Sequence, residues 1–178
     1  VRMKVYIVRH TSVDAPYEIC YGQTDVPVRE ASFEAEASQV KERLVGATFD
    51  IVFTSPLTRC VRLATYCGYA DAVRDPRLME LDFGDWEWTF IYDNHSAEVR
   101  HWFEHQLTQR APNGESFVDM QARLKHFLDE QRARGFSKIC LFAHGGIHLC
   151  AQMLQGTTFD NDIFMHLPPY GSIVEYDF

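Results

Sequence analysis

The segment K-V-Y-I-V-R-H-T at positions 4–11 decides the fold that we expect for this chain. Its run of apolar, mostly β-branched residues is too short for a helix and ends abruptly in polar residues. This pattern is typical of a buried strand that opens into a loop. The segment K-I-C-L-F-A-H-G-G at positions 138–146 repeats it. Both predicted strands therefore end in a histidine, His10 in the first and His144 in the second.

We expect these two histidines to belong to one site. If the two strands are parallel neighbours, their carboxyl ends meet at the sheet edge where open α/β folds bind ligands. A single histidine at a strand end is more often a structural residue held by hydrogen bonds. Here Arg9 precedes the first histidine, and Gly145 and Gly146 follow the second. This combination favours a functional site over two unrelated structural residues.

The composition indicates one globular domain over residues 1–178. With 46% hydrophobic residues, the chain can bury a core without disulfides. A net charge of −8 argues against nucleic acid or an anionic membrane surface as partner, so an anion site needs a few local cations. The five cysteines are odd in number and lack C-x-x-C spacing, which predicts free thiols. With no signal-peptide or membrane-span pattern, we expect a cytoplasmic protein.

The remaining segments alternate between helical and strand patterns. We expect helices over residues 30–45 and 94–108, one that Ser116 caps and one that follows Gly146 to about Leu154, and strands over residues 49–53, 72–74 and 170–178. Residues 11–30 carry prolines, a glycine and polar side chains, which indicates a loop over the site edge. The order predicts an α/β fold with three layers, in which a mostly parallel sheet has helices on both faces.

The segment T-S-P-L-T-R at positions 54–59 predicts the start of a helix. Ser55 suits the N-cap and Pro56 suits the first helical position. Arg59 then lies in the first turn, at the same sheet edge as His10, where free N–H groups and the helix dipole favour an anion. A solvated surface arginine is the alternative.

Glu80 is the strongest candidate for a general acid. It lies between Met79 and Leu81 in an acidic and aromatic loop, and apolar neighbours can raise the pKa of a carboxyl group. A solvated loop carboxylate is the more common alternative. His101 and His105 are one helical turn apart but have no evident third ligand, so we expect a solvated helix face there and no metal site.

Five blocks of the sequence resemble motifs of the histidine phosphatase superfamily, the phosphoglycerate-mutase-like group of phosphoryl-transfer enzymes. The blocks follow the family order over nearly the whole chain: R-H-T at 9–11, S-P-L-T-R at 55–59, L-M-E-L-D-F-G-D-W-E at 78–87, P-N-G-E-S at 112–116 and H-G-G at 144–146. The chain departs from the family pattern at Thr11, where the motif has a glycine. It departs again at positions 14–16, where an asparagine is expected.

The resemblance implies a phosphoglycerate-mutase-like fold and a phosphoric monoester hydrolase of the histidine acid phosphatase type. His10 would be the nucleophile that carries the phosphoryl group as phosphohistidine. Arg9 and Arg59 would bind the phosphoryl oxygens, with His144 as a third positive donor. Glu80 would protonate the leaving oxygen. Because these groups suffice for the reaction, we expect neither a cofactor nor a metal.

Two segments, Y-G-Q-T-D-V-P at 21–27 and F-G-D-W-E at 83–87, look most like the alpha-ribazole phosphatases of cobalamin biosynthesis. This likeness implies a small-molecule substrate, alpha-ribazole 5′-phosphate. It also implies a set of substrate-binding residues: Tyr21, Gly22, Gln23 and Gly145. Further aromatic side chains are expected at the rim of the site, where they would pack on a flat benzimidazole: Tyr17, Tyr21, Phe83, Trp86 and Trp88. The alternatives are a broad-specificity phosphatase, a phosphoglycerate mutase and a non-catalytic phosphate-binding domain.

Overall fold

The computed structural model describes residues 2–178, and its centre is a five-stranded sheet in the order β3-β2-β4-β1-β5. The strands are β1 (Lys4–Arg9), β2 (Ile51–Thr54), β3 (Val73–Arg74), β4 (Lys138–Ala143) and β5 (Ile173–Asp177). The first four are parallel to their neighbours, and β5 runs antiparallel to β1 at the edge. The mostly parallel α/β sheet that the sequence predicts is confirmed.

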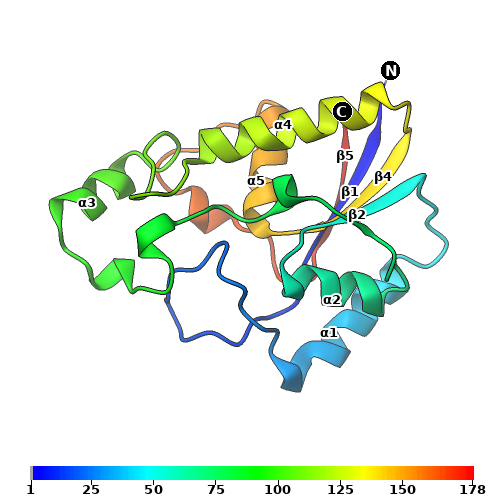
Figure 1. Cartoon of the computed structure of the whole chain (residues 1–178), viewed down its shortest axis with the longest axis horizontal. Coiled ribbons are helices and arrows are strands. Elements are labelled where there is room, and N and C mark those ends of the chain that lie inside the picture. The colour runs from blue at the N-terminus through cyan, green and yellow to red at the C-terminus, as the bar shows by residue number, and fades with distance from the viewer. Residues whose placement is uncertain (1) are drawn as a thin grey trace.

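Helices cover both faces of this sheet, so the predicted three layers are confirmed as well (Figure 1). On one face lie α1 (Glu30–Arg43) and α2 (Thr58–Tyr66), and on the other α4 (Phe117–Ala133) and α5 (Gly145–Leu154). Alternating residues of β1 supply the two cores, since Ile7 packs with the α4 and α5 side and Val8 with the α1 and α2 side. None of the described helices has the length and apolarity needed to cross a bilayer.

The start of α4 follows the sequence closely. Ser116 accepts a hydrogen bond from the Asp119 N–H, and the Asp119 carboxylate accepts one from the Ser116 N–H, which completes a capping box. The helix then buries the side chains that the helical spacing predicts: Phe117, Met120, Leu124, Phe127 and Leu128. By contrast, α3 (Ala97–Glu104) is shorter than predicted and begins only after Ser96, which caps it. The five cysteines are unpaired, as expected.

The predicted cap of α2 is wrong. Leu57, not Ser55, is the N-cap, and the helix begins at Thr58. Ser55 is instead buried, with its Oγ 2.9 Å from Nε2 of His144, and the Leu57 N–H donates to the same Oγ at 3.3 Å. The Asp25 carboxylate, from the loop before α1, accepts hydrogen bonds of 2.8 Å from both the N–H and the hydroxyl of Thr58. Arg59 nevertheless lies in the first turn of α2, as predicted.

One buried histidine links α5 to β5 and makes the stability of the fold depend on pH. His148 of α5 has its Nδ1 3.4 Å from the Tyr176 hydroxyl of β5. Burial, and to a lesser extent the charge of Arg9, lowers the pKa of His148 to about 3. Unfolding returns this pKa to about 6.5. Between these two values the unfolded chain binds a proton that the folded chain does not, so stability falls as the pH falls.

We therefore predict that His148→Gln makes the fold less sensitive to acid. Each such proton lowers the free energy of unfolding by about 1.4 kcal/mol per pH unit below the unfolded pKa. Urea titrations between pH 6.5 and 4.5 measure the free energy of unfolding at each pH. Its fall per pH unit should be smaller in the variant than in the wild type, by about 1.4 kcal/mol. The exposed His95 provides the control, and His95→Gln should keep the wild-type slope. Equal slopes for all three proteins would contradict the prediction.

Candidate active site

The pairing of β1 with β4 brings His10 and His144 together. Arg9 lies opposite Ala143 in the parallel register, so the next residue of each strand is a histidine. The ring centroids of the two histidines are 5.3 Å apart at an interplanar angle of 64°. Both side chains are buried, with 2% of His10 and none of His144 exposed. His144 also forms the N-cap of α5, so the positive end of that helix faces the pair.

The ring of His10 is held in one tautomer. Its Nδ1 lies 2.8 Å from the carbonyl oxygen of Thr11. Because a carbonyl oxygen can only accept, Nδ1 must carry the hydrogen and donate it. The lone pair is then on Nε2, which is the atom available for attack on an electrophile.

Both histidines are neutral in this environment. Burial lowers the pKa of His10 well below its usual range, and the positive charges of Arg59 and Arg9 lower it further. Burial and then the charge of Arg59 do the same to the pKa of His144. The lowered pKa favours an uncharged His144 imidazole, whose Nε2 lies 2.9 Å from the hydroxyl of Ser55, and the role of His144 as a third positive donor to a bound phosphoryl group stays a prediction.

The positive charge of the site comes from two arginines, each held by backbone carbonyls. Arg59 is fully buried and donates to the carbonyl of Thr24 at 2.7 Å and to that of Gly22. Arg9, which is 9% exposed, donates to the carbonyl of Pro168.

Three buried donors of this site lack a partner within residues 2–178: the Nε atoms of Arg9 and Arg59 and the hydroxyl of Thr11. A buried donor without a partner costs free energy, and an anion between the arginines would satisfy those two guanidinium N–H groups. This arrangement suits a phosphoryl group placed against His10.

Glu80 is held at the start of α5. Its Oε2 accepts from the Gly146 N–H at 3.1 Å, and its Oε1 accepts from the Leu81 N–H at 2.8 Å. Its backbone carbonyl accepts from the side chains of Gln23 at 3.1 Å and Arg123 at 3.0 Å. The carboxyl group thus lines the same cavity as His10.

The loop before α1 is shaped by Glu87, a residue to which the sequence analysis assigned no role. Its carboxylate accepts hydrogen bonds from the N–H groups of Gly22, Gln23 and Thr24. A Cβ at Gly22 would lie 1.7 Å from the carbonyl oxygen of Leu81, so this position requires glycine. Gly22 and Gln23 thus shape the loop, and their predicted contact with a substrate stays a prediction. The sequence feature that could have predicted this role is the position of an acidic residue directly after the aromatic segment Phe83–Trp86.

A cavity of about 190 Å³ opens beside His10. Arg9, His10 and Glu80 supply its guanidinium, imidazole and carboxyl groups, and six aromatic residues form much of its wall: Tyr21, Phe83, Tyr92, Trp102, Phe164 and Tyr170. We call this space the inner cavity. The ring of Tyr170 stacks on the Arg9 guanidinium at 4.3 Å, and that of Tyr21 lies 5.3 Å from the guanidinium of Arg59. The hydroxyls of the two tyrosines are 3.3 Å apart.

Only part of the predicted aromatic rim lines this cavity. Tyr21 and Phe83 do so. Trp86 instead belongs to the core, where it packs edge-on against Trp102 at 5.8 Å. Trp88, 45% exposed, is not among the residues that line the inner cavity. The walls that the sequence analysis missed, Tyr92, Trp102, Phe164 and Tyr170, come from segments without a motif.

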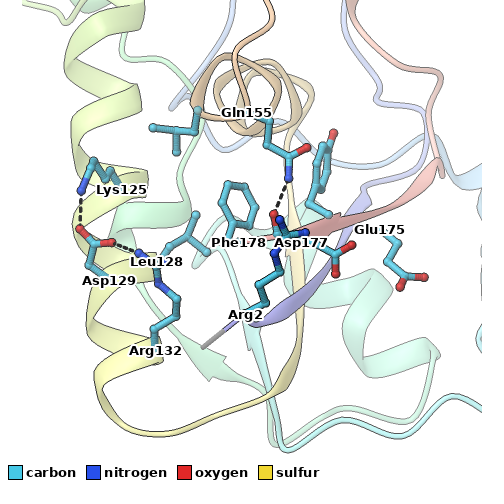
Figure 2. A pocket seen from close by; sticks show the side chains of 11 residues that line it. Arg2, Lys125, Leu128, Asp129, Arg132, Gln155, Glu175, Asp177 and Phe178 are labelled. Carbon is cyan, nitrogen blue, oxygen red and sulfur yellow. Dashed lines mark hydrogen bonds and ion pairs between the residues drawn. The ribbon is translucent and has the colours of Figure 1, made fainter.

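Other clusters of polar residues do not form a comparable site. A larger hollow of about 660 Å³ lies between α4 and β5, and no predicted site residue lines it within the described chain (Figure 2). Its Asp129 is paired with Lys125 at 2.6 Å and with Arg132 at 2.7 Å. His101 and His105 stack at 4.2 Å, but residues 2–178 contain no group of three side chains that could hold a metal.

Comparison with known proteins identifies related sequences. The family model described as "Histidine phosphatase superfamily (branch 1)" matches residues 5–178. The chain is 36% identical to the Probable phosphoglycerate mutase GpmB of Cronobacter sakazakii, over 68% of this chain and 60% of that protein. It is 24% identical to Phosphoserine phosphatase 1 of Hydrogenobacter thermophilus, over 76% of this chain and 67% of that protein.

A third relative and a solved structure have further substrates in their names. The chain is 27% identical to the Adenosylcobalamin/alpha-ribazole phosphatase of Escherichia coli, over 82% of this chain and 75% of that protein. The mycobacterial glucosyl-3-phosphoglycerate phosphatase superposes with a TM-score of 0.85, covering 99% of this chain and 91% of that one. At 23% identity this likeness shows the fold alone. The names of these proteins give different substrates.

The diglycine at the start of α5 yields a prediction about Glu80. A Cβ at Gly146 would lie 2.0 Å from Oε1 of Glu80, so Gly146→Ala must displace the carboxyl group. We predict that kcat for hydrolysis of an alkyl phosphate falls at least tenfold, because the carboxyl group of Glu80 is displaced. Binding of vanadate should change little, because Arg9 and Arg59 are not displaced. Thermal unfolding checks that the variant is folded. A folded variant with wild-type kcat would show that the position of Glu80 is not critical.

Proposed function

The chain belongs to branch 1 of the histidine phosphatase superfamily, and we propose that it hydrolyses a phosphate monoester through a phosphohistidine at His10. One observation carries the proposal. A neutral imidazole, with its Nδ1–H bound to a carbonyl, lies in the field of two buried guanidiniums whose Nε–H groups have no partner within residues 2–178. A nucleophile for phosphorus needs such a free Nε2, and the phosphoryl oxygens need such donors.

In the first step, Nε2 of His10 attacks phosphorus and the bond from phosphorus to the ester oxygen breaks. Arg9 and Arg59 bind the phosphoryl oxygens and stabilise their negative charge. Glu80, as a carboxylic acid, gives its proton to the departing oxygen, so the product leaves as an alcohol. His10 now carries the phosphoryl group, and Glu80 is a carboxylate.

In the second step, water replaces the alcohol. Glu80 takes a proton from the water as its oxygen attacks phosphorus, and the bond from phosphorus to Nε2 breaks. Inorganic phosphate leaves, and both side chains return to their starting states. The residues of this chain thus supply the nucleophile, the charge stabilisation and the proton transfer.

For the substrate, we propose alpha-ribazole 5′-phosphate. The aromatic rings of Tyr21, Tyr92 and Tyr170 beside the site suit contact with a flat, uncharged group, and one relative carries alpha-ribazole in its name. Phosphoserine and phosphoglycerate each carry a carboxylate beside the phosphate, which requires another cation. Arg9 is the only Lys or Arg that lines the inner cavity within the described chain, and the phosphoryl group engages it.

Replacement of Glu80 tests the mechanism through the leaving group. Glu80→Gln should lower kcat/KM about 10²–10⁴-fold for an alkyl phosphate but far less for p-nitrophenyl phosphate, whose phenolate departs without a proton. His10→Ala should abolish turnover of both esters, whereas the control His95→Ala should not. Equal losses for the two esters would remove Glu80 from this role. If His10→Ala still hydrolyses the esters, a phosphohistidine at His10 is not the intermediate. If the wild type binds vanadate but hydrolyses neither ester, the chain is a phosphate-binding domain and not an enzyme.

A substrate panel tests the finer assignment. We predict that alpha-ribazole 5′-phosphate has a kcat/KM about tenfold above those of 3-phosphoglycerate and phosphoserine, because one aromatic contact typically contributes about 0.5–1.5 kcal/mol. Steady-state phosphate release gives the three values. If a carboxylated ester leads, the assignment changes to the activity named for that relative.

A further inference from the structure

The inner cavity is too small to hold a substrate that contains a ring system and a sugar. Its volume of about 190 Å³ lies below the roughly 300–1,000 Å³ that is usual for small-molecule sites. The phosphoryl group at His10 takes part of this space. Either the substrate is short, or it continues beyond the inner cavity.

A second hollow adjoins the inner cavity and gives the substrate room to continue. It measures about 640 Å³, and we call it the outer groove. Ten residues line it: Val13, Ala15, Pro16, Tyr17, Glu18, Ile19, Tyr21, Arg29, Tyr92 and Tyr170. Four of them, Ile19, Tyr21, Tyr92 and Tyr170, also line the inner cavity. The two spaces therefore share part of their walls, and the shared residues include Tyr21 and Tyr170, whose hydroxyls are 3.3 Å apart.

The side chains that line the outer groove favour one chemical class of substituent on the substrate. Four of its ten residues are tyrosines, which present flat apolar rings and a polar edge. Tyr17 is 88% exposed and Tyr92 is 53% exposed, so large aromatic surface is left open there. The two charged residues, Glu18 and Arg29, have opposite signs and give no preference for a second anion. A flat, uncharged heterocycle suits this surface.

We propose that the outer groove is a second subsite, which binds the planar aromatic group of a phosphate ester whose phosphoryl group lies at His10. This inference rests on the proposed function and adds the place where the far end of the substrate binds. The inner cavity then holds the phosphoryl group and the sugar, and the tyrosines that line both spaces lie beside the link between the sugar and the ring. Tyr17 becomes a specificity residue that lies outside every motif of the chain.

The test compares two esters with the same leaving oxygen. Benzimidazole riboside 5′-phosphate and methyl riboside 5-phosphate both release a primary ribose alcohol, so they differ only in the planar ring. We expect the wild type to favour the benzimidazole ester about tenfold in kcat/KM, mostly through KM. Tyr17→Ala should reduce this preference about 2–10-fold. Ala15→Trp, which fills the groove, should raise KM for the benzimidazole ester more than for the methyl riboside.

The experiment includes a control variant, and the results that would overturn the subsite differ from those that would overturn the proposed hydrolysis. Val45 is similarly exposed, at 78%, but lies at the end of α1, outside the lining of the groove, and Val45→Ala should keep the wild-type preference. Equal kcat/KM for the two esters, or a preference that neither groove variant changes, would overturn the subsite while leaving the hydrolysis intact. An octyl phosphate that gains as much as the benzimidazole ester would overturn the choice of a planar group. No turnover of any ester would overturn the proposed function itself.

Discussion

The parallel pairing of β1 with β4 is the constraint on which the site depends. It sets Arg9 opposite Ala143, and the His10 N–H extends the ladder by donating to the Ala143 carbonyl at 3.2 Å. A slip of one residue would move His10 by about 3.3 Å relative to His144, about the length of a hydrogen bond. It would also exchange Ile7 and Val8 between the two cores. The packing of the sheet therefore fixes the distance between the two histidines.

The second constraint is electrostatic, because the site buries the Arg9 and Arg59 guanidinium groups, and neither forms an ion pair with a carboxylate of residues 2–178. Arg59 is fully buried, and an unpaired buried charge costs several kcal/mol. The loop at residues 22–24 resolves this cost. Its carbonyls at Gly22 and Thr24 accept from Arg59, and its N–H groups at Gly22, Gln23 and Thr24 donate to the Glu87 carboxylate. Arg59 and Glu87 thus hold the same loop, the one through its carbonyls and the other through its N–H groups.

Local sequence patterns predicted the strands, the sheet edge and the residues that meet there, because strand period and polar strand ends are local properties. They failed where a side chain has a distant partner. Ser55 has the right type and position for an N-cap, but its hydroxyl faces His144, from β4, and α2 begins later.

The walls of the inner cavity were missed for a related reason. Tyr92, Trp102, Phe164 and Tyr170 come from segments spread over about 80 positions and carry no motif. The spacing of apolar residues around these rings predicts that they are buried. The packing of the loops then decides which of the buried rings face a cavity. The first two glycines of α5 were predictable as a motif, whereas their effect on two neighbours was not.

Those glycines make one helix end responsible for two different tasks. A Cβ at Gly145 would lie 3.1 Å from Nε of Arg9, and one at Gly146 would overlap the carboxyl group of Glu80. Because neither glycine carries a Cβ, the Arg9 guanidinium, which would bind phosphate, and the Glu80 carboxyl group, which would donate a proton, can both contact the start of α5. In phosphoryl transfer, the oxygens that Arg9 would bind and the oxygen that Glu80 would protonate belong to the same phosphorus centre. Because both side chains pack against one helix end, a side chain at either glycine would displace the cation or the acid and change the geometry between them.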